Sequence, residues 1–192
     1  MGKQRENQII YADPETCLGC HSCELSCAVA HGAGDLQGAV AGGQLLRPRN
    51  KVVLTGGICM PMQCRQCEDA PCAFACPTGA VVQEDGQVRI REKNCVGCKL
   101  CVMVCPFGAV SVAAEDKPDG RFRTNRGVAK KCDLCADWRA RSGRTSPACV
   151  EACPTRSLRL VDMEAYRRAL REARAAELAL SHKHLSLRKV NP

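Results

Sequence analysis

Hydrophobic side chains recur at three- and four-residue steps in one long stretch, residues 163–180. This spacing is typical of an α-helix with one apolar face, and Asp162 before it is a suitable N-cap. The simplest expectation is a helix packed on its own domain. The segment 181–192 is polar and basic and too short to form a core of its own. The apolar positions are Met163, Tyr166, Leu170, Ala173, Ala176 and Leu180.

The other hydrophobic runs are short, and three of them follow a repeated turn. Each copy begins with Cys-Pro and continues into an aliphatic or β-branched run, which predicts a short strand. The copies begin at Cys76, Cys105 and Cys153. Asp85-Gly86 separates two such runs and predicts a tight hairpin. Short strands and short helices are therefore expected to alternate with cysteine-rich loops, which is an α+β fold.

Composition changes this picture, because little of the 192-residue chain is aromatic. Hydrophobic residues make up 45% but aromatic residues only 3%, while cysteine occurs 17 times. The first residues form neither a signal peptide nor a membrane span, so the sequence predicts a cytoplasmic protein with no direct membrane insertion. Attachment to the periphery of a membrane complex stays open. In a reducing compartment, dense cysteine indicates metal binding rather than disulfides.

Sixteen of the cysteines fall into four quartets, and Cys59 is left over. The first and third quartets have the spacing C-x2-C-x2-C-x3-C; the second and fourth lengthen the gap before the third cysteine and keep the final x3. The quartets are Cys17, Cys20, Cys23 and Cys27; Cys64, Cys67, Cys72 and Cys76; Cys95, Cys98, Cys101 and Cys105; Cys132, Cys135, Cys149 and Cys153.

This spacing is typical of bacterial ferredoxins, in which three thiolates bind one [4Fe–4S] cube and the fourth reaches another. Four zinc sites are the alternative, but zinc modules normally have two separated cysteine pairs. No C-x3-C-x2-C run is present that would leave an iron open. The sequence therefore predicts four fully ligated [4Fe–4S] clusters that transfer electrons, no catalytic residues, and a chain that is not itself an enzyme.

The crossover rule assigns the cysteines to clusters, since the fourth cysteine of each quartet binds the partner cluster. The second and third quartets lie close in sequence and pair with each other, so the first and fourth pair around the outside. The inner clusters would take Cys64, Cys67, Cys72 and Cys105, and Cys76, Cys95, Cys98 and Cys101. The outer clusters would take Cys17, Cys20, Cys23 and Cys153, and Cys27, Cys132, Cys135 and Cys149.

The charge of the chain fits these clusters. The side chains sum to +8, and sixteen thiolates with four +2 cores sum to about −8. A near-neutral holoprotein with few aromatics argues against nucleic-acid binding. A basic segment, residues 121–144, either compensates the clusters locally or docks an acidic partner. It contains Arg121, Arg123, Arg126, Lys130, Lys131, Arg139, Arg141 and Arg144.

The quartets and the run Pro61–Cys72 resemble the four-cluster ferredoxin-type electron-transfer subunits, the superfamily of the dimethyl sulfoxide reductase iron–sulfur subunit. The stretch Ala12–His31 most resembles the carbon monoxide dehydrogenase iron–sulfur subunit. After Cys27 this chain has Ala28 where the other quartets have proline, which leaves the exit of the chain from that loop open. The roles of Cys59, His21, His31 and Trp138 also stay open.

This resemblance implies tandem two-cluster ferredoxin-like folds over residues 8–162. The inner module would span 58–112, the outer module 8–57 plus 113–162, and a C-terminal helix and basic tail 163–192. The implied function is electron transfer from carbon monoxide dehydrogenase to a hydrogenase or other redox acceptor. The alternatives are the same role in a formate dehydrogenase–hydrogenase or molybdenum oxidoreductase complex and, more distantly, a zinc-stabilised nucleic-acid-binding protein.

Overall fold

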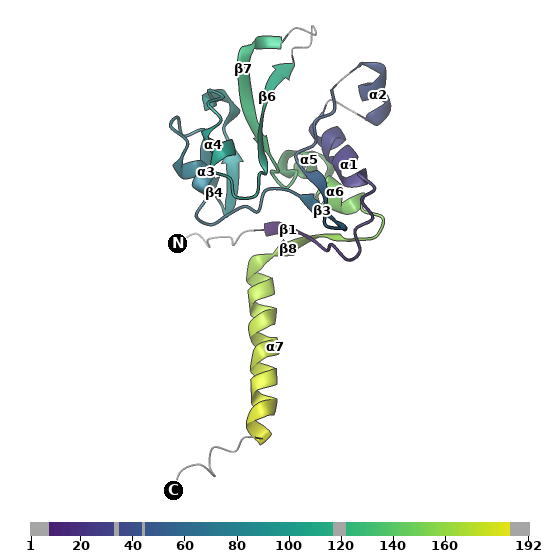
Figure 1. Cartoon of the computed structure of the whole chain (residues 1–192), viewed down its shortest axis with the longest axis vertical. Coiled ribbons are helices and arrows are strands. Elements are labelled where there is room, and N and C mark those ends of the chain that lie inside the picture. The colour runs from purple at the N-terminus through teal and green to yellow at the C-terminus, as the bar shows by residue number, and fades with distance from the viewer. Residues whose placement is uncertain (1–7, 33–34, 44, 117–121, 185–192) are drawn as a thin grey trace.

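The computed structural model describes residues 8–32, 35–43, 45–116 and 122–184, without the side chains of 114–116, 122–126 and 182–184. It consists of a body of small sheets and short helices, from which one long helix projects (Figure 1). The strands are β1 (Gln8–Ala12), β2 (Lys51–Thr55), β3 (Ile58–Met62), β4 (Val81–Glu84), β5 (Gln87–Ile90), β6 (Val110–Asp116), β7 (Phe122–Lys131) and β8 (Leu158–Asp162). The helices are α1 (Ser22–His31), α2 (Leu36–Ala41), α3 (Pro71–Phe74), α4 (Leu100–Met103), α5 (Ala136–Ser142), α6 (Ala148–Glu151) and α7 (Met163–His184), with a 3₁₀ turn at Glu92–Asn94.

In the described part of the chain, every sheet is an antiparallel pair of strands. The pairs β2–β3, β4–β5 and β6–β7 each join neighbours in sequence, whereas β1 pairs with β8. The register of that last pair runs from Gln8 opposite Asp162 to Ala12 opposite Leu158. The two ends of the body are therefore joined in one sheet, and the mixture of helices and small antiparallel sheets is the predicted α+β class.

The hairpin predicted at Asp85-Gly86 is present between β4 and β5. Both turn residues have positive φ, 50° for Asp85 and 71° for Gly86. A two-residue turn with positive φ at both positions matches the right-handed twist of the flanking strands, and aspartate and glycine adopt it readily. The prediction is confirmed by the register of the pair, in which Glu84 faces Gln87.

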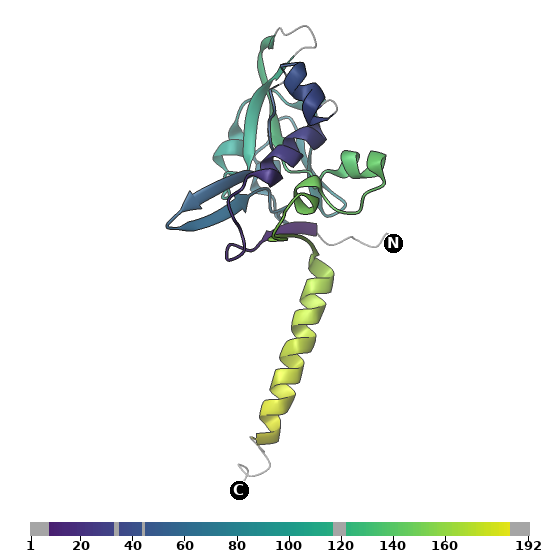
Figure 2. The same cartoon turned by 90° about the vertical axis from the view of Figure 1, so that its right-hand side faces the viewer.

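The predicted helix is also present as α7, and Asp162 Oδ1 accepts a hydrogen bond from the Ala165 N–H at 3.0 Å. The expectation that it packs on the domain is wrong. The helix projects away from the body in both views (Figures 1 and 2), and Tyr166 and Leu180 remain 53% and 62% exposed. Within the described residues, no helix is long and apolar enough to cross a bilayer.

The Cys-Pro turns end three of the short helices. Helices α3, α4 and α6 stop before Cys76-Pro77, Cys105-Pro106 and Cys153-Pro154, because a proline disfavours helical backbone at the residue before it. Ala28 imposes no such stop, so α1 continues through the last cysteine of the first quartet to His31. This answers how the chain leaves that loop: it leaves as a helix.

The buried hydrophobic residues form two main cores in which cysteines replace aromatic side chains. One core combines Cys72, Cys95 and Cys101 with aliphatic residues of β4 to β7. The other combines Cys23, Cys64, Cys132 and Cys149 with residues of β1 and β8. Thiols thus supply the interior that the few aromatics cannot fill.

Candidate metal centres

The structure gathers the sixteen quartet cysteines into four groups, which we call sites A to D. Each group combines three cysteines of one quartet with one from another quartet. Site A is Cys17, Cys20, Cys23 and Cys153; site B is Cys27, Cys132, Cys135 and Cys149; site C is Cys64, Cys67, Cys72 and Cys105; site D is Cys76, Cys95, Cys98 and Cys101.

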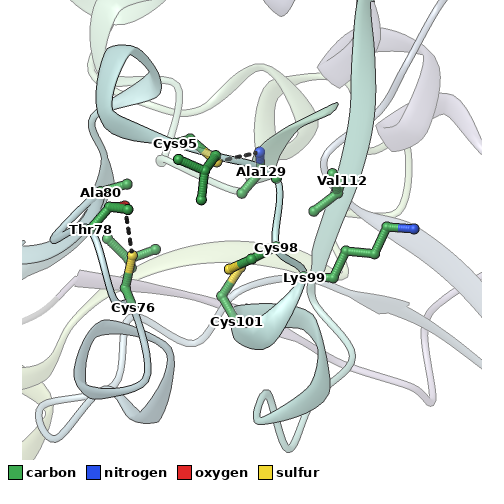
Figure 3. A pocket seen from close by; sticks show the side chains of 12 residues that line it. Cys76, Thr78, Ala80, Cys95, Cys98, Lys99, Cys101, Val112 and Ala129 are labelled. Atoms are coloured by element: carbon green, nitrogen blue, oxygen red, sulfur yellow. Dashed lines mark hydrogen bonds between the residues drawn. The ribbon is translucent and has the colours of Figure 1, made fainter. Parts of the chain in front are cut away.

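Site D is a pocket lined by its four cysteines and mainly by aliphatic side chains. The cysteines surround one hollow, and the side chain of Lys99 points away from it (Figure 3). The Ala129 N–H of β7 donates to Cys95 Sγ at 3.4 Å, and Thr78 Oγ1 lies 3.7 Å from Cys76 Sγ. The surroundings are therefore apolar, with a few polar groups directed at sulfur.

Site A is a similar pocket between the first quartet and the turn after α6. Cys153 Sγ lies 3.2 Å from Ser157 Oγ and 3.7 Å from Thr155 Oγ1. Burial acts against ionisation, but these hydroxyls and nearby N–H groups lower the pKa of Cys153 to about 7. A hydrogen bond with Ser22 likewise lowers the pKa of Cys20.

Site C lies between α3, α4 and the loop before α3. The pKa of Cys72 is raised to about 11 by burial and by interaction with Cys64 and Cys105. Cys67 interacts with the same two thiols. The Ala109 N–H donates to Cys105 Sγ at 3.4 Å, so a backbone donor also faces a sulfur here.

Site B is the most enclosed, since all four of its cysteines are buried. Burial raises the pKa of Cys149, and the thiols of Cys132, Cys27 and Cys135 raise it further. Burial also raises the pKa of Cys135 to about 12. Trp138 packs beside Cys135, with the Arg144 guanidinium 5.1 Å from its ring centre. Trp138 therefore packs against the hydrophobic cluster formed by Ala30, Cys135 and Ala148, which includes one site B cysteine.

An ion-pair network joins the two segments that build site B. His31 Nε2 lies 2.9 Å from Asp133 Oδ1, and Arg49 Nη1 donates to Asp133 Oδ2 at 2.7 Å. The pKa of His31 is raised to about 9: burial opposes this, and the hydrogen bonds to Asp133 and Cys27 together with the charge of Asp133 outweigh it. The Arg49 N–H donates to Cys27 Sγ at 3.3 Å. His31 Nδ1 lies 3.6 Å from Cys27 Sγ, so the network reaches a predicted ligand of site B.

Glycines let the cysteine loops approach other segments closely. Gly97 has φ +70°, and a Cβ there would lie 2.3 Å from the Gly127 carbonyl oxygen of β7. Gly19, the matching position of the first quartet, has φ +65°, and a Cβ there would meet Cys59 Sγ at 2.8 Å. The unassigned Cys59 is therefore a packing neighbour of the first cysteine loop, on β3.

The donor sets fit iron–sulfur clusters. Four thiolates facing one another in apolar surroundings repel each other, so holding all four ionised requires a compensating positive charge. A cationic iron–sulfur core supplies it. Asn50, directly after Arg49, is 4% exposed, and neither of its side-chain polar atoms has a hydrogen-bond partner among the described residues. The side-chain N–H groups of Asn50 are therefore available to donate a hydrogen bond to a sulfur atom of a cluster.

The sequence pattern of the 4Fe-4S dicluster domain family matches residues 56–163. The chain belongs to this family. An iron–sulfur protein of Rhodospirillum rubrum is 65% identical over 182 residues, which cover 94% of this chain and 96% of that protein. The electron transport protein HydN of Escherichia coli K12 is 38% identical over 161 residues, covering 81% of this chain and 89% of HydN.

Formate hydrogenlyase subunit 2 of Escherichia coli K12 is a further relative, 36% identical over 180 residues that cover 81% of this chain and 82% of that subunit. Together with the family, these relatives make the chain an iron–sulfur electron transport protein that holds 4Fe–4S clusters.

Sequence reasoning missed the polar residues that support the sites. Asp133 and Lys131 flank Cys132; the sequence indicated Lys131 only as one charge of the basic segment and gave no role to Asp133. The side chains of Arg121, Arg123 and Arg126 in that segment lie outside the described residues. The alternation along β7 was an available signal: Lys130 pairs with Glu92 at the surface, so Lys131 must face the opposite way.

Proposed function

We propose that sites A to D each hold one [4Fe–4S] cluster and that the chain passes electrons between two redox enzymes without substrate chemistry of its own. The observation that carries this proposal is the gathering of sixteen cysteines into four separate groups of four. Such clusters supply reversible one-electron transfer when bound. The protein supplies thiolate ligands, N–H donors to sulfur and apolar surroundings that exclude water.

The contacts between sites support a linear order A–B–C–D. Cys149 of site B interacts with Cys23 of site A, and Cys132 of site B interacts with Cys64 of site C. Sites C and D share α3 and α4. Helix α3 contains Cys72 of site C and is followed by Cys76 of site D. Helix α4 contains Cys101 of site D and is followed by Cys105 of site C. Sites A and D each have one exposed cysteine, Cys20 and Cys98, while sites B and C have none. Electrons would therefore enter and leave near these two cysteines.

For the partners, we propose a carbon monoxide dehydrogenase as the donor and a hydrogenase as the acceptor. The support is the resemblance of Ala12–His31 to the carbon monoxide dehydrogenase iron–sulfur subunit. In the structure, this stretch includes the end of β1, the site A loop and all of α1. It therefore forms the surface around one end of the proposed wire, where a donor-specific sequence would act.

A formate dehydrogenase–hydrogenase or molybdenum oxidoreductase complex is the second candidate. It is favoured by one observation, the similarity to a protein named formate hydrogenlyase subunit 2. The same order of sites would serve either donor, because the enzyme bound at the end determines what is oxidised.

Metal analysis tests the cofactor part of the proposal. Protein purified without oxygen is expected to contain about sixteen iron and sixteen sulfide per chain, since four clusters of four irons are required. About eight iron per chain would reduce the proposal to two clusters. About four zinc with little iron would refute it.

Donor-dependent reduction tests the partners. The oxidised holoprotein is mixed with a catalytic amount of carbon monoxide dehydrogenase and CO, or of formate dehydrogenase and formate, and the loss of visible absorbance is timed. Rapid reduction with CO alone supports the first candidate, and with formate alone the second. A Cys98→Ser variant, which is altered at site D, tests which end of the wire receives the electrons. If they enter at site A, that site still becomes reduced in this variant. Slow reduction by both pairs would contradict the proposal.

A further inference from the structure

Lys131 is a buried cation at the middle of the proposed wire. It is the last residue of β7, directly before Cys132 of site B, and it is only 3% exposed. Lysine is almost never this buried unless its charge is compensated. Among the residues whose side chains the structure describes, no carboxylate lies within ion-pair distance of its Nζ atom; the contact described for Nζ is with the Cys132 carbonyl oxygen.

The contacts of Lys131 place its ammonium where sites B and C meet. Nζ donates to the Cys132 carbonyl oxygen at 2.9 Å, and Gln66 Nε2 donates to the same oxygen at 2.9 Å. The two nitrogen atoms are therefore no more than about 5.8 Å apart. Gln66 is itself 1% exposed and directly precedes Cys67 of site C. The Cys132 carbonyl oxygen thus accepts one hydrogen bond from Lys131, beside site B, and one from Gln66, beside site C.

Electrostatics in the chain agree with this placement. Burial raises the pKa values of Cys67 and Cys72, and the charge of Lys131 acts in the opposite direction on both. The cation consequently favours the ionised thiols of site C. Four thiolates around a cluster core leave a net negative charge at each site, which grows by one on reduction.

We propose that Lys131 is the fixed counter-cation of the site C cluster and raises its reduction potential, so that the middle of the wire accepts electrons readily from its neighbours. This inference rests on the proposed occupancy of the sites. At an effective dielectric constant of about 20, a unit charge within about 10 Å changes an equilibrium constant by roughly tenfold or more. Removing the charge should therefore lower the reduction constant of this cluster about tenfold, or about 59 mV for one electron.

Redox titration of the anaerobic holoprotein, followed by paramagnetic resonance, tests this. The site C signal is identified by its alteration in Cys67→Ser. Lys131→Met keeps the length of the side chain and removes the charge, and Lys130→Met is the matched control one residue away. We expect the site C potential to fall in Lys131→Met, to stay in Lys130→Met, and to be largely kept in Lys131→Arg. Unchanged potentials in Lys131→Met would overturn the inference.

Loss of iron in a variant remains informative. Loss of site C iron in both Lys131→Met and Lys131→Gln, with retention in Lys131→Arg, also supports the inference, because charge alone separates the variants. Equal loss in all three would contradict it. A wild-type chain with about twelve irons and no signal altered by Cys67→Ser would refute the four-cluster proposal and this inference together. Four clusters with unaltered potentials in Lys131→Met would refute this inference alone.

Discussion

Replacing Gly97 by alanine should damage site D far more than replacing Gly79, although both glycines lie in turns beside site D ligands. Both have positive φ, +70° and +61°. They differ in their surroundings: a Cβ at position 97 would lie 2.3 Å from the Gly127 carbonyl oxygen, whereas a Cβ at position 79 would have nothing within 4 Å. Gly79→Ala therefore isolates the backbone cost, and Gly97→Ala adds a collision with backbone.

The two costs can be estimated separately. An alanine in the left-handed region costs about 1 kcal/mol. The collision adds about 2 kcal/mol or more, because Gly127 cannot withdraw as a flexible side chain would. For a chain of this size, 1 kcal/mol changes the unfolding temperature by about 2–4 °C. We expect about 2–4 °C for Gly79→Ala and about 6–12 °C for Gly97→Ala.

Unfolding of both holoprotein variants is followed without oxygen at one heating rate, with iron per chain measured beforehand. The collision should also move β7 from the loop and weaken the hydrogen bond from the Ala129 N–H to Cys95 Sγ, so the site D signal should change in Gly97→Ala alone. Equal losses of stability in the two variants would refute the reasoning, since only the contact with Gly127 distinguishes them.

Three further predictions concern sites A and B and the projecting helix. Cys153→Ala should disturb the paramagnetic signal of site A and leave site B intact; a change confined to site B would contradict the grouping of the cysteines. Asp133→Asn should destabilise the holoprotein by about 2 kcal/mol, or about 4–8 °C, because its carboxylate accepts from two cationic side chains, whereas exposed Asp137→Asn should have little effect. Because the apolar positions of α7 remain exposed, we also expect this helix to contact the partner enzyme. A chain ending at Asp162 should then keep its full iron content, yet bind that enzyme more weakly in an anaerobic binding titration; unchanged affinity would contradict this role of α7.

Local spacing explains what could be predicted from the sequence. The grouping of three cysteines in each loop depends on a few neighbouring residues, and so do the Asp85-Gly86 hairpin and the N-cap at Asp162. Each of these features is determined by residues that lie only a few positions apart in the sequence. The structure reproduces them because no distant contact competes with them.

Distant contacts explain what could not. The pairing of β1 with β8 depends on residues some 150 positions apart in sequence, and neither strand has a pattern that names its partner. The exposure of α7 could not be predicted either. An apolar stripe indicates that one face of a helix packs against something, but it does not identify the packing partner. The buried position of Lys131 depends on which face of β7 meets the cysteine loops.

The outer sites impose a requirement that the inner sites do not. The ligands of sites C and D lie between Cys64 and Cys105, whereas those of sites A and B extend from Cys17 to Cys153, so the two ends of the body must meet before either outer site is complete. Loop-closure entropy grows only slowly with loop length, so a few specific contacts can hold such distant segments together. The β1–β8 pair joins residues 8–12 to residues 158–162, and the Asp133 ion pairs join His31 and Arg49 to the loop that carries Cys132 and Cys135. This explains why the polar residues that sequence reasoning missed are concentrated at site B: sites C and D are built from neighbouring loops, whereas sites A and B need side chains that contact each other across the chain.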